Sequence, residues 1–249
     1  MRSIRIAMTA TILAVCVSAC GGSDSSGPNS SVTTADSEVS ESASVAEAES
    51  SATVQQADPA DDRTFIPGDR VGAIKPGVTD DDIRSIYGAE NVQKSSVDLG
   101  EGGRASVTAV YKGTDDEVSV MWQDNAKTKL DSVYVVGKNW KSPEGVGIGT
   151  SFDKLVQINA KPITFYGFEW DYGGTIAKWN GGKLQYFTAN SVVRTGLSDE
   201  NFEKHYEESL AGDKEFSSDL PASKRMAPYQ LVREIILNFA DEEDYVDVE

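Results

Sequence analysis

Two short stretches of the chain share one pattern, and that pattern decides the expected fold. Gly77-Val78-Thr79-Asp80-Asp81-Asp82-Ile83-Arg84-Ser85-Ile86 aligns with Gly149-Thr150-Ser151-Phe152-Asp153-Lys154-Leu155-Val156-Gln157-Ile158, about 72 residues later. In each stretch a glycine is followed two residues later by a hydroxyl residue, and then by aliphatic residues four and seven positions further on. This pattern is typical of a capped helix with one apolar stripe. Each stretch therefore predicts the start of a short helix.

The first stretch carries the signals of a helix that begins after Thr79. Thr79 is a suitable N-cap, and Asp82 completes a capping box three residues later. Asp80 and Asp81 place negative charge at the positive end of the helix dipole. The expected buried stripe consists of Ile83, Ile86 and Tyr87. Gly88 is expected to end the helix.

Three strands are predicted between the two stretches. They are Ala105–Tyr111, Glu117–Trp122 and Leu130–Val136. In the first two, apolar side chains alternate with polar ones, which is typical of strands that bury one face. Residues 112–116 have turn chemistry and join these two strands. A meander of strands is therefore expected after the first helix.

A second group of strands is predicted after the second helix. The expected strands are Thr164–Tyr172, Thr175–Trp179, Lys183–Thr188 and Ser191–Arg194. Alternation in the first of them puts four aromatic residues on one face: Tyr166, Phe168, Trp170 and Tyr172. Asn180-Gly181 is a strong signal for a tight hairpin turn. The second helix is therefore also expected to lead into a meander.

The remaining residues predict one more helix and one more strand. Ser198 is a suitable N-cap for a helix that runs to Leu210, and the β-branched residues of Leu231–Phe239 favour a strand. The expected fold class is α+β. It consists of tandem repeats of a helix plus an antiparallel strand meander, at about residues 71–137 and 145–194, forming a sheet packed by helices. A C-terminal extension follows.

Residues 1–19 have the features of a secretory signal peptide. Met1–Arg5 is basic, and Ile6–Val17 is apolar but shorter than the about 20 residues that a membrane span needs. Val17-Ser18-Ala19-Cys20 resembles the lipobox of bacterial lipoproteins. The resemblance implies cleavage before Cys20, diacylglycerol on its sulfur and anchoring by acyl chains. The alternative is an ordinary signal peptide with an incidental cysteine.

A change of composition near residue 62 marks the expected start of the folded domain. Residues 20–62 hold no basic and no aromatic residue, and such a segment cannot bury enough apolar surface to offset its ordering entropy. We therefore predict a disordered acidic tether at 20–62. The α+β domain is expected at 63–240, followed by an acidic tail at 241–249.

Composition excludes several classes of function. Lys plus Arg number 23 and Asp plus Glu number 40, which gives a formal net charge of −17. Such a surface repels phosphate backbones, so no nucleic-acid partner is expected. The two cysteines, Cys16 and Cys20, precede the domain, and His205 is the only histidine. Zinc sites built from cysteine and histidine are therefore excluded, and no metal or cofactor is expected.

Two acidic runs raise the alternative of calcium binding. Asp80–Asp82 and Asp115–Glu117 both lack the spacing and the distal glutamate of an EF-hand loop. The first run is explained by helix capping, and the second is interpreted as a solvated turn.

The repeat also resembles known proteins. The Gly-x-Thr-x-x-x-Ile opening at Gly77, followed by aromatic strands, resembles the tandem repeat of the beta-lactamase inhibitor protein and of small outer-membrane assembly lipoproteins. The resemblance covers about residues 71–194 and implies a concave sheet that is presented to a protein partner. The run Gly167–Gly174, with Trp179 and Gly181-Gly182 after it, also resembles a set of uncharacterised bacterial envelope proteins. Neither group allows a binding residue to be transferred.

The candidate binding residues lie in the aromatic strand. They are Tyr166, Phe168, Glu169, Trp170, Asp171 and Tyr172. Residues two apart share a face of a strand, so Glu169 and Asp171 are expected side by side, near the separation that retaining glycosidases use. The aromatic rings would then point to the opposite face, which weakens a hydrolase interpretation. The simplest interpretation is an aromatic core face with a solvated acidic face opposite.

The sequence as a whole predicts a lipid-anchored protein of the cell envelope that is not an enzyme. Its expected role is a protein-interaction or scaffold module, with an envelope protein as partner and the membrane bound through Cys20. In a bacterium with two membranes, the outer membrane is the expected location, facing the periplasm or the cell surface. The alternative function is an envelope glycan binder or hydrolase that uses Glu169 and Asp171. A purely structural lipoprotein is a third alternative.

Overall fold

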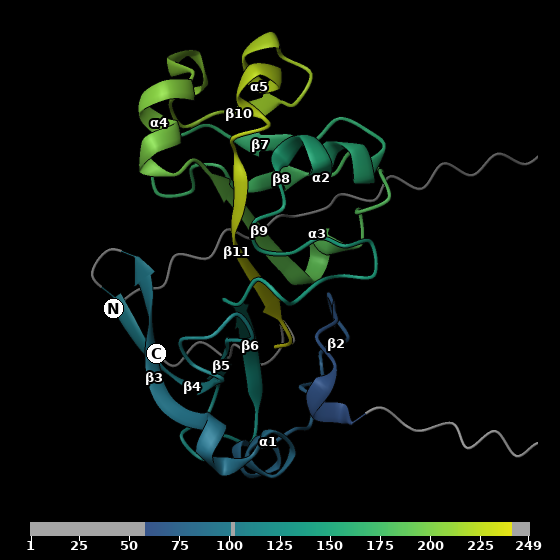
Figure 1. The fold of residues 1–249 in the computed structure, drawn as a ribbon, viewed down its shortest axis with the longest axis vertical. Helices are drawn as coiled ribbons and strands as arrows, with labels where there is room; N and C mark the ends of the chain where they lie inside the picture. The colour runs from purple at the N-terminus through teal and green to yellow at the C-terminus, as the bar shows by residue number, and fades with distance from the viewer. Residues whose placement is uncertain (1–57, 101–102, 241–249) are drawn as a thin grey trace, which may run out of the picture. The chain divides into compact units, whose positions relative to one another are not determined.

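A six-stranded antiparallel sheet organises the domain (Figure 1). The computed structural model describes residues 58–100 and 103–240, which belong to a unit spanning Val54–Glu249. The strands of the six-stranded sheet follow the order β3-β4-β5-β6-β11-β9. Their bounds are β3 Val92–Gly100, β4 Gly103–Val110, β5 Val118–Trp122, β6 Leu130–Val135, β11 Leu231–Asn238 and β9 Ser191–Gly196. Strands β3 to β6 form a meander, and β11, the last strand within the described ranges, lies between β6 and β9.

Two smaller sheets complete the strands of the described residues. One has the order β10-β7-β8, and the other pairs β1 with β2. Their bounds are β10 Glu215–Ser217, β7 Thr164–Tyr166, β8 Ile176–Lys178, β1 Phe65–Ile66 and β2 Arg70–Val71. β7 and β8 therefore do not extend the main sheet.

The helices are short. The α-helices are α1 Asp80–Tyr87, α2 Phe152–Asn159, α3 Phe187–Asn190, α4 Asp199–His205 and α5 Pro221–Met226. The 3-10 turns are η1 Pro59–Asp61, η2 Ala89–Asn91 and η3 Glu208–Leu210. None of the helices in the described ranges combines the length and the apolar character needed to cross a bilayer.

The structure confirms the α+β fold class and the signals at α1. Thr79 accepts a hydrogen bond from the Asp82 backbone nitrogen, and the Asp82 side chain accepts one from the Thr79 nitrogen. Gly88 occupies the C-cap with a φ of 83°. Ile83 and Tyr87 are buried. A helix also begins after Ser151, and Ser198 caps α4, as the sequence predicts.

One continuous apolar core joins the first and second halves of the domain. Its largest fully buried aromatic side chains are Trp140, Phe65, Phe152, Phe165 and Phe187. Phe152 and Phe165 meet edge to face with ring centroids 5.1 Å apart, and Phe65 meets Phe187 in the same way at 6.2 Å. The Trp140 ring nitrogen donates to the Asp116 backbone oxygen at 2.8 Å, which satisfies its polar group.

The predicted meander of the second repeat is wrong in two places. The strand expected at Thr164–Tyr172 ends at Tyr166, and the strand expected at Lys183–Thr188 is a run of turns followed by α3. Asn180 and Gly181 do form a turn with positive φ values of 52° and 68°, but the chain beyond it does not pair with β8.

Asn159 explains why the chain turns here. This fully buried residue ends α2, and its amide nitrogen donates to the carbonyl oxygens of Trp179 and Lys161, both at 2.9 Å. Its side-chain oxygen accepts from the Leu184 backbone nitrogen at 3.1 Å. The segment after β8 therefore wraps around one polar side chain, which satisfies the buried backbone groups that a strand would have paired.

Several other features lie outside the sequence predictions. β3 was not expected, because polar residues fill most of its positions. α4 ends at His205, and Leu210 reaches the core from η3 instead of from a longer helix. Near the predicted boundary at residue 62, η1 covers Pro59–Asp61, and Asp62 accepts hydrogen bonds from Thr64. Cys20, the signal peptide, most of the tether and the tail at 241–249 lie outside the described residues.

Candidate functional site

The candidate binding residues lie on a closed loop between β7 and β8. The loop begins at Tyr166, whose backbone oxygen accepts a hydrogen bond from the Gly174 nitrogen at 2.9 Å. Within it, Gly173 donates to the Trp170 oxygen at 2.9 Å, and Thr175 donates to the Tyr172 oxygen at 3.1 Å. These bonds make residues 169–174 a bend and a turn instead of a strand. We call residues 166–174 the aromatic loop.

Three aromatic rings of the loop form a continuous row, which we call the aromatic ladder: Tyr166, Trp170 and Tyr172. Tyr166 and Trp170 meet edge to face with centroids 5.6 Å apart, and Trp170 meets Tyr172 at 5.2 Å. The Trp170 ring nitrogen donates to the Gly167 oxygen at 2.8 Å. Tyr172 is 39% exposed, and the other two rings are half-buried. The ladder is thus an ordered aromatic surface with one side open to solvent.

Phe168 points away from this ladder and into the domain. It is 8% exposed, and its ring lies 6.0 Å from Phe165 and 6.2 Å from Tyr206. The prediction that Tyr166, Phe168, Trp170 and Tyr172 share one face is therefore wrong. The turn that begins after Phe168 changes the alternation, so three rings are at least partly exposed and the Phe168 ring anchors the loop in the core.

Glu169 has a backbone conformation that is rare for its residue type. Its φ is +67°, in the left-handed region, and its side chain is exposed. Burial raises the pKa of the Tyr206 phenol to about 12, and the nearby negative charge of Glu169 adds to this shift. The loop thus brings a carboxylate next to Tyr206, a residue within the helix that the sequence predicts from Ser198 to Leu210.

Asp171 is exposed within the turn. The expected pairing of Glu169 and Asp171 assumed that both lie on one strand face. Because both residues lie in a bend and turn, that assumption is wrong and the spacing typical of retaining glycosidases no longer follows. What the structure brings together is the row of rings, and the two exposed carboxylate residues flank Trp170 in the sequence.

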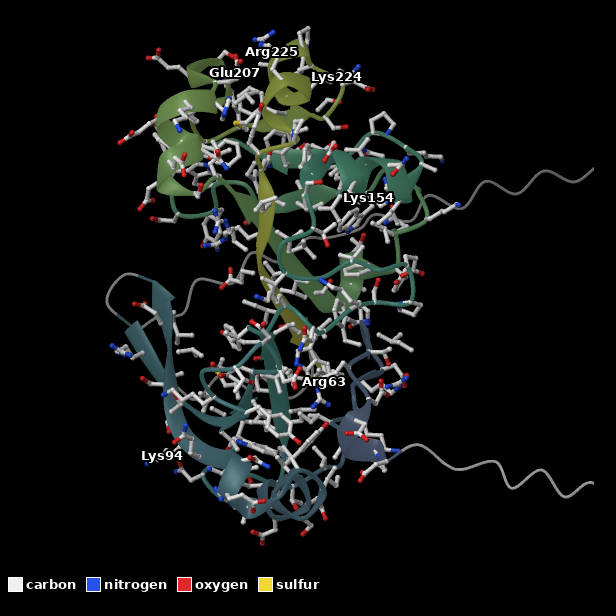
Figure 2. The ribbon with its side chains drawn as sticks, in the orientation of Figure 1. Arg63, Lys94, Lys154, Glu207, Lys224 and Arg225 are labelled. Carbon is white, nitrogen blue, oxygen red and sulfur yellow. The ribbon has the colours of Figure 1, made fainter. Side chains whose placement is uncertain are left out.

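An ion pair joins α5 to the segment between α4 and η3 (Figure 2). Arg225 of α5 donates from its Nε and one terminal nitrogen to the two carboxylate oxygens of Glu207, both at 2.7 Å. His205 stacks on Tyr229 with ring centroids 3.5 Å apart. The only histidine of the chain therefore contacts an aromatic ring, and no cluster of three potential metal-ligating side chains occurs among the described residues.

The acidic runs serve the fold. Asp116 pairs with Arg63 at 3.1 Å, and Asp115 pairs with Lys138 at 3.0 Å. In the first run, Asp82 caps α1 and Asp80 contacts Lys127 at 3.0 Å. Each run is thus tied to hydrogen-bond donors of the domain itself.

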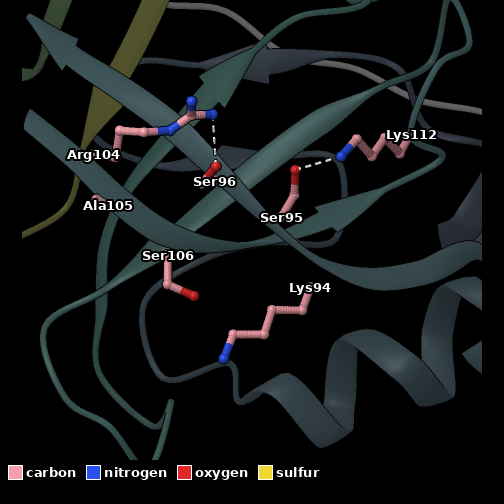
Figure 3. A pocket seen from close by; sticks show the side chains of 7 residues that line it. All are labelled: Lys94, Ser95, Ser96, Arg104, Ala105, Ser106 and Lys112. Carbon is pink, nitrogen blue, oxygen red and sulfur yellow. Dashed lines mark hydrogen bonds between the residues drawn. The ribbon is translucent and has the colours of Figure 1, made fainter. Parts of the chain in front are cut away.

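A second candidate site is an open depression of about 590 Å³ on the β3–β4 hairpin (Figure 3). It is lined by Lys94, Ser95, Ser96, Arg104, Ala105, Ser106 and Lys112. Lys112 donates to Ser95 at 2.7 Å, and Arg104 donates to Ser96 at 2.9 Å. Lys94 points away from Lys112, so the basic groups do not converge on one anion. The aromatic ladder remains the stronger candidate.

Comparison with known proteins adds little. No protein-family model and no curated protein matches the chain. Among solved structures, the chain is similar to a crystal structure of the uncharacterized protein yfeY from Escherichia coli. The sequence identity is 13%, the TM-score is 0.34, and the match covers 69% of this chain and 94% of that one. Similarity at this level supports no inference about this chain.

Proposed function

We propose that the protein is a non-enzymatic interaction module of the cell envelope, and that the aromatic ladder is its contact surface. The observation that carries the proposal is the row of Tyr166, Trp170 and Tyr172, which is ordered by ring contacts and has Tyr172 open to solvent. Tyrosine and tryptophan are enriched in the cores of protein interfaces, because they supply large contact areas at a small cost in side-chain entropy.

The attachment of the loop supports a binding role. Phe168 anchors it in the core, and the Gly174 oxygen accepts a hydrogen bond from the Thr195 nitrogen of β9 at 2.9 Å. A loop held at both points presents its rings in one arrangement before a partner arrives. Such preorganisation lowers the entropic cost of binding.

The proposed location rests on the N-terminal sequence. Acyl chains on Cys20 would hold the domain at a membrane, and the segment up to residue 62 would let it reach a partner away from the membrane surface. Fatty-acid labelling of the wild type and of Cys20→Ser tests this part separately. Loss of label and release from the membrane are expected for Cys20→Ser, and retention of both would contradict the anchor.

Site-specific crosslinking tests the contact surface. A photoreactive phenylalanine analogue is placed at Tyr172 or at Tyr229, whose exposures are nearly equal at 39% and 38%. We expect a discrete protein adduct from position 172 that is lost when Trp170→Ala is added, and no such adduct from position 229. Equal adducts from both positions, or none from 172, would refute the aromatic ladder as the interface.

Glycan binding is the second candidate, and one observation favours it. Glu169 and Asp171 are exposed and flank Trp170 in the sequence, so carboxylates that can accept sugar hydroxyl groups accompany an aromatic surface. Binding of soluble cell-wall glycan fragments by the wild type, weakened in Glu169→Gln with Asp171→Asn, would favour this candidate. Glycan binding that is unchanged in this double variant would exclude a role for the two carboxylates.

A further inference from the structure

The outer edge of β3 is the longest unpaired strand edge of the main sheet in the described ranges. β3 has nine residues and pairs only with β4 (Figure 1). The opposite edge, at β9, is shorter and is covered by the bridge between Thr175 and Arg194. Exposed edges tend to pair with other chains, and proteins protect them with proline, bulges, charged side chains or covering segments. β3 contains no proline, and its register with β4 is irregular only between Asp98 and Gly100. It does carry the charged residues Lys94 and Asp98, so a partner strand must match these charges.

The hydrogen-bond pattern shows which residues of β3 offer their backbone to a partner. Val92 lies opposite Val110, and one residue earlier the Tyr111 nitrogen donates to the Asn91 oxygen at 2.9 Å. In an antiparallel ladder bonded and non-bonded pairs alternate, so the odd-numbered residues of β3 bond to β4. The backbone N–H and C=O groups of the even-numbered residues, Lys94, Ser96 and Asp98, therefore point to the outer edge of the sheet.

We propose that β3 binds β3 of a second copy of this chain, antiparallel and with a two-fold axis at Ser96. In this register Ser96 lies opposite the partner's Ser96, and Lys94 lies opposite the partner's Asp98. All three outward-pointing residues then form bonded pairs, which adds six backbone hydrogen bonds between the copies. The sheet would continue from one copy into the other.

Charge complementarity selects both the occupant and the register. Lys94 and Asp98 lie four residues apart and project from the same face of β3. Around Ser96 each lysine meets an aspartate, whereas two-fold axes at Lys94 or Asp98 would place like charges opposite each other, which is destabilising. Asp98 already interacts within its own chain and lies across from Arg104 in the hairpin, so its carboxylate would be shared between these surroundings and the partner's Lys94. A strand with this spacing is complementary to itself.

Cysteine crosslinking of the full-length chain, in detergent extracts of membranes, tests the register. Residues opposite each other in a bonded pair have Cα atoms about 5.5 Å apart, a distance that a disulfide spans. Ser96→Cys is expected to give a disulfide-linked dimer at least tenfold above that of the exposed-site control Lys154→Cys. A chain with Lys94→Cys alone or with Asp98→Cys alone should form little disulfide-linked dimer. Co-expression of the two variant chains should give efficient crosslinking between them. The wild-type chain controls for disulfides formed by the native residues Cys16 and Cys20.

Charge reversal tests the same contact without a crosslink. Lys94→Glu and Asp98→Lys should each raise the dimer dissociation constant ~tenfold, and an equimolar mixture should recover the wild-type value. Misfolding of either variant cannot produce such recovery, and Lys154→Glu should behave as wild type. Failure of Ser96→Cys to exceed the control, or failure of the mixture to recover, would overturn the proposal. A β3 edge covered by another part of this chain would give that result.

Discussion

Asp80 shows how much chemistry one residue of a capping sequence can gather. Its carboxylate accepts hydrogen bonds from Lys127 at 3.0 Å, from Arg84 at 2.8 Å and from the Thr108 hydroxyl. Trp122 donates to the same Thr108 hydroxyl at 3.0 Å. The sequence accounts for a charge at the helix N-terminus, but Lys127 lies 47 residues away and only the fold brings it here.

Stability should depend on pH through this carboxylate. Burial by itself would raise the pKa of Asp80, but the hydrogen bonds from Thr108, Lys127 and Arg84 outweigh it and hold the pKa below its usual 3.8. A depressed pKa contributes stability at pH values above 3.8, and this contribution is lost as the pH falls through the folded-state pKa. Asp80→Asn is expected to cost about 1–3 kcal/mol at pH 7. The difference from wild type should shrink toward pH 3.

Urea unfolding at several pH values measures this difference. Asp81→Asn is the matched control, because Asp81 is in the same helical turn and its side chain is exposed. A pH-independent effect of Asp80→Asn, or an equal effect of the control, would contradict the role of the charged contacts.

The aromatic loop depends on one glycine at the scale of the element. Gly174 has a φ of +76°, and a Cβ atom there would lie 2.0 Å from the Thr195 oxygen and 2.9 Å from the Phe168 ring. The backbone of the loop thus approaches β9 as closely as a residue without a side chain allows. The sequence named the aromatic residues of the site, but their arrangement follows from this contact and from the turn after Phe168.

Gly174→Ala should therefore destabilise the domain more than left-handed backbone strain alone does. Gly113 has a similar φ of +82°, and nothing lies within 4 Å of its added Cβ. We expect Gly113→Ala to lower the free energy of unfolding by about 1 kcal/mol, because of backbone strain alone. Gly174→Ala should lower it by about 3 kcal/mol or more, because steric overlap adds to the backbone strain. Thermal unfolding of both variants measures the difference. Equal losses of stability in the two variants would show that the loop does not approach β9 closely at Gly174.

At the scale of the whole molecule, the fold depends on β11. β11 pairs with β6 through Ile235–Asn238 and with β9 along Leu231–Leu237. It therefore joins the meander of the first half to the second half, and its residues Val232, Ile235 and Leu237 are fully buried.

Removal of this strand should abolish folding. A chain that ends at Gln230 would expose the edges of β6 and β9. It would also lose three buried apolar side chains, each of which stabilises the fold by about 1.5–3 kcal/mol. The summed loss is comparable to the whole unfolding free energy of a typical domain. A chain that ends at Ala240 keeps β11 and is the control. Circular dichroism and protease resistance should show a folded control and an unfolded shorter chain. A folded shorter chain would mean that the two halves do not need this strand.

Local patterns in the sequence determined the elements whose signals lie within a few residues. The capping box of α1, the strands β4, β5 and β6 and the terminal strand β11 all follow from spacing, alternation and side-chain shape. These signals work because a helix turn or a strand face is set by neighbours along the chain.

Tertiary structure decided the second half and the candidate site. Asn159 turns the chain where alternation predicted a strand, and Gly174 and Phe168 fix the loop that presents the aromatic ladder. These contacts join residues that are distant in the chain. Their free energy depends on packing and on satisfying buried polar groups, and the order of amino acids in a short window does not encode either.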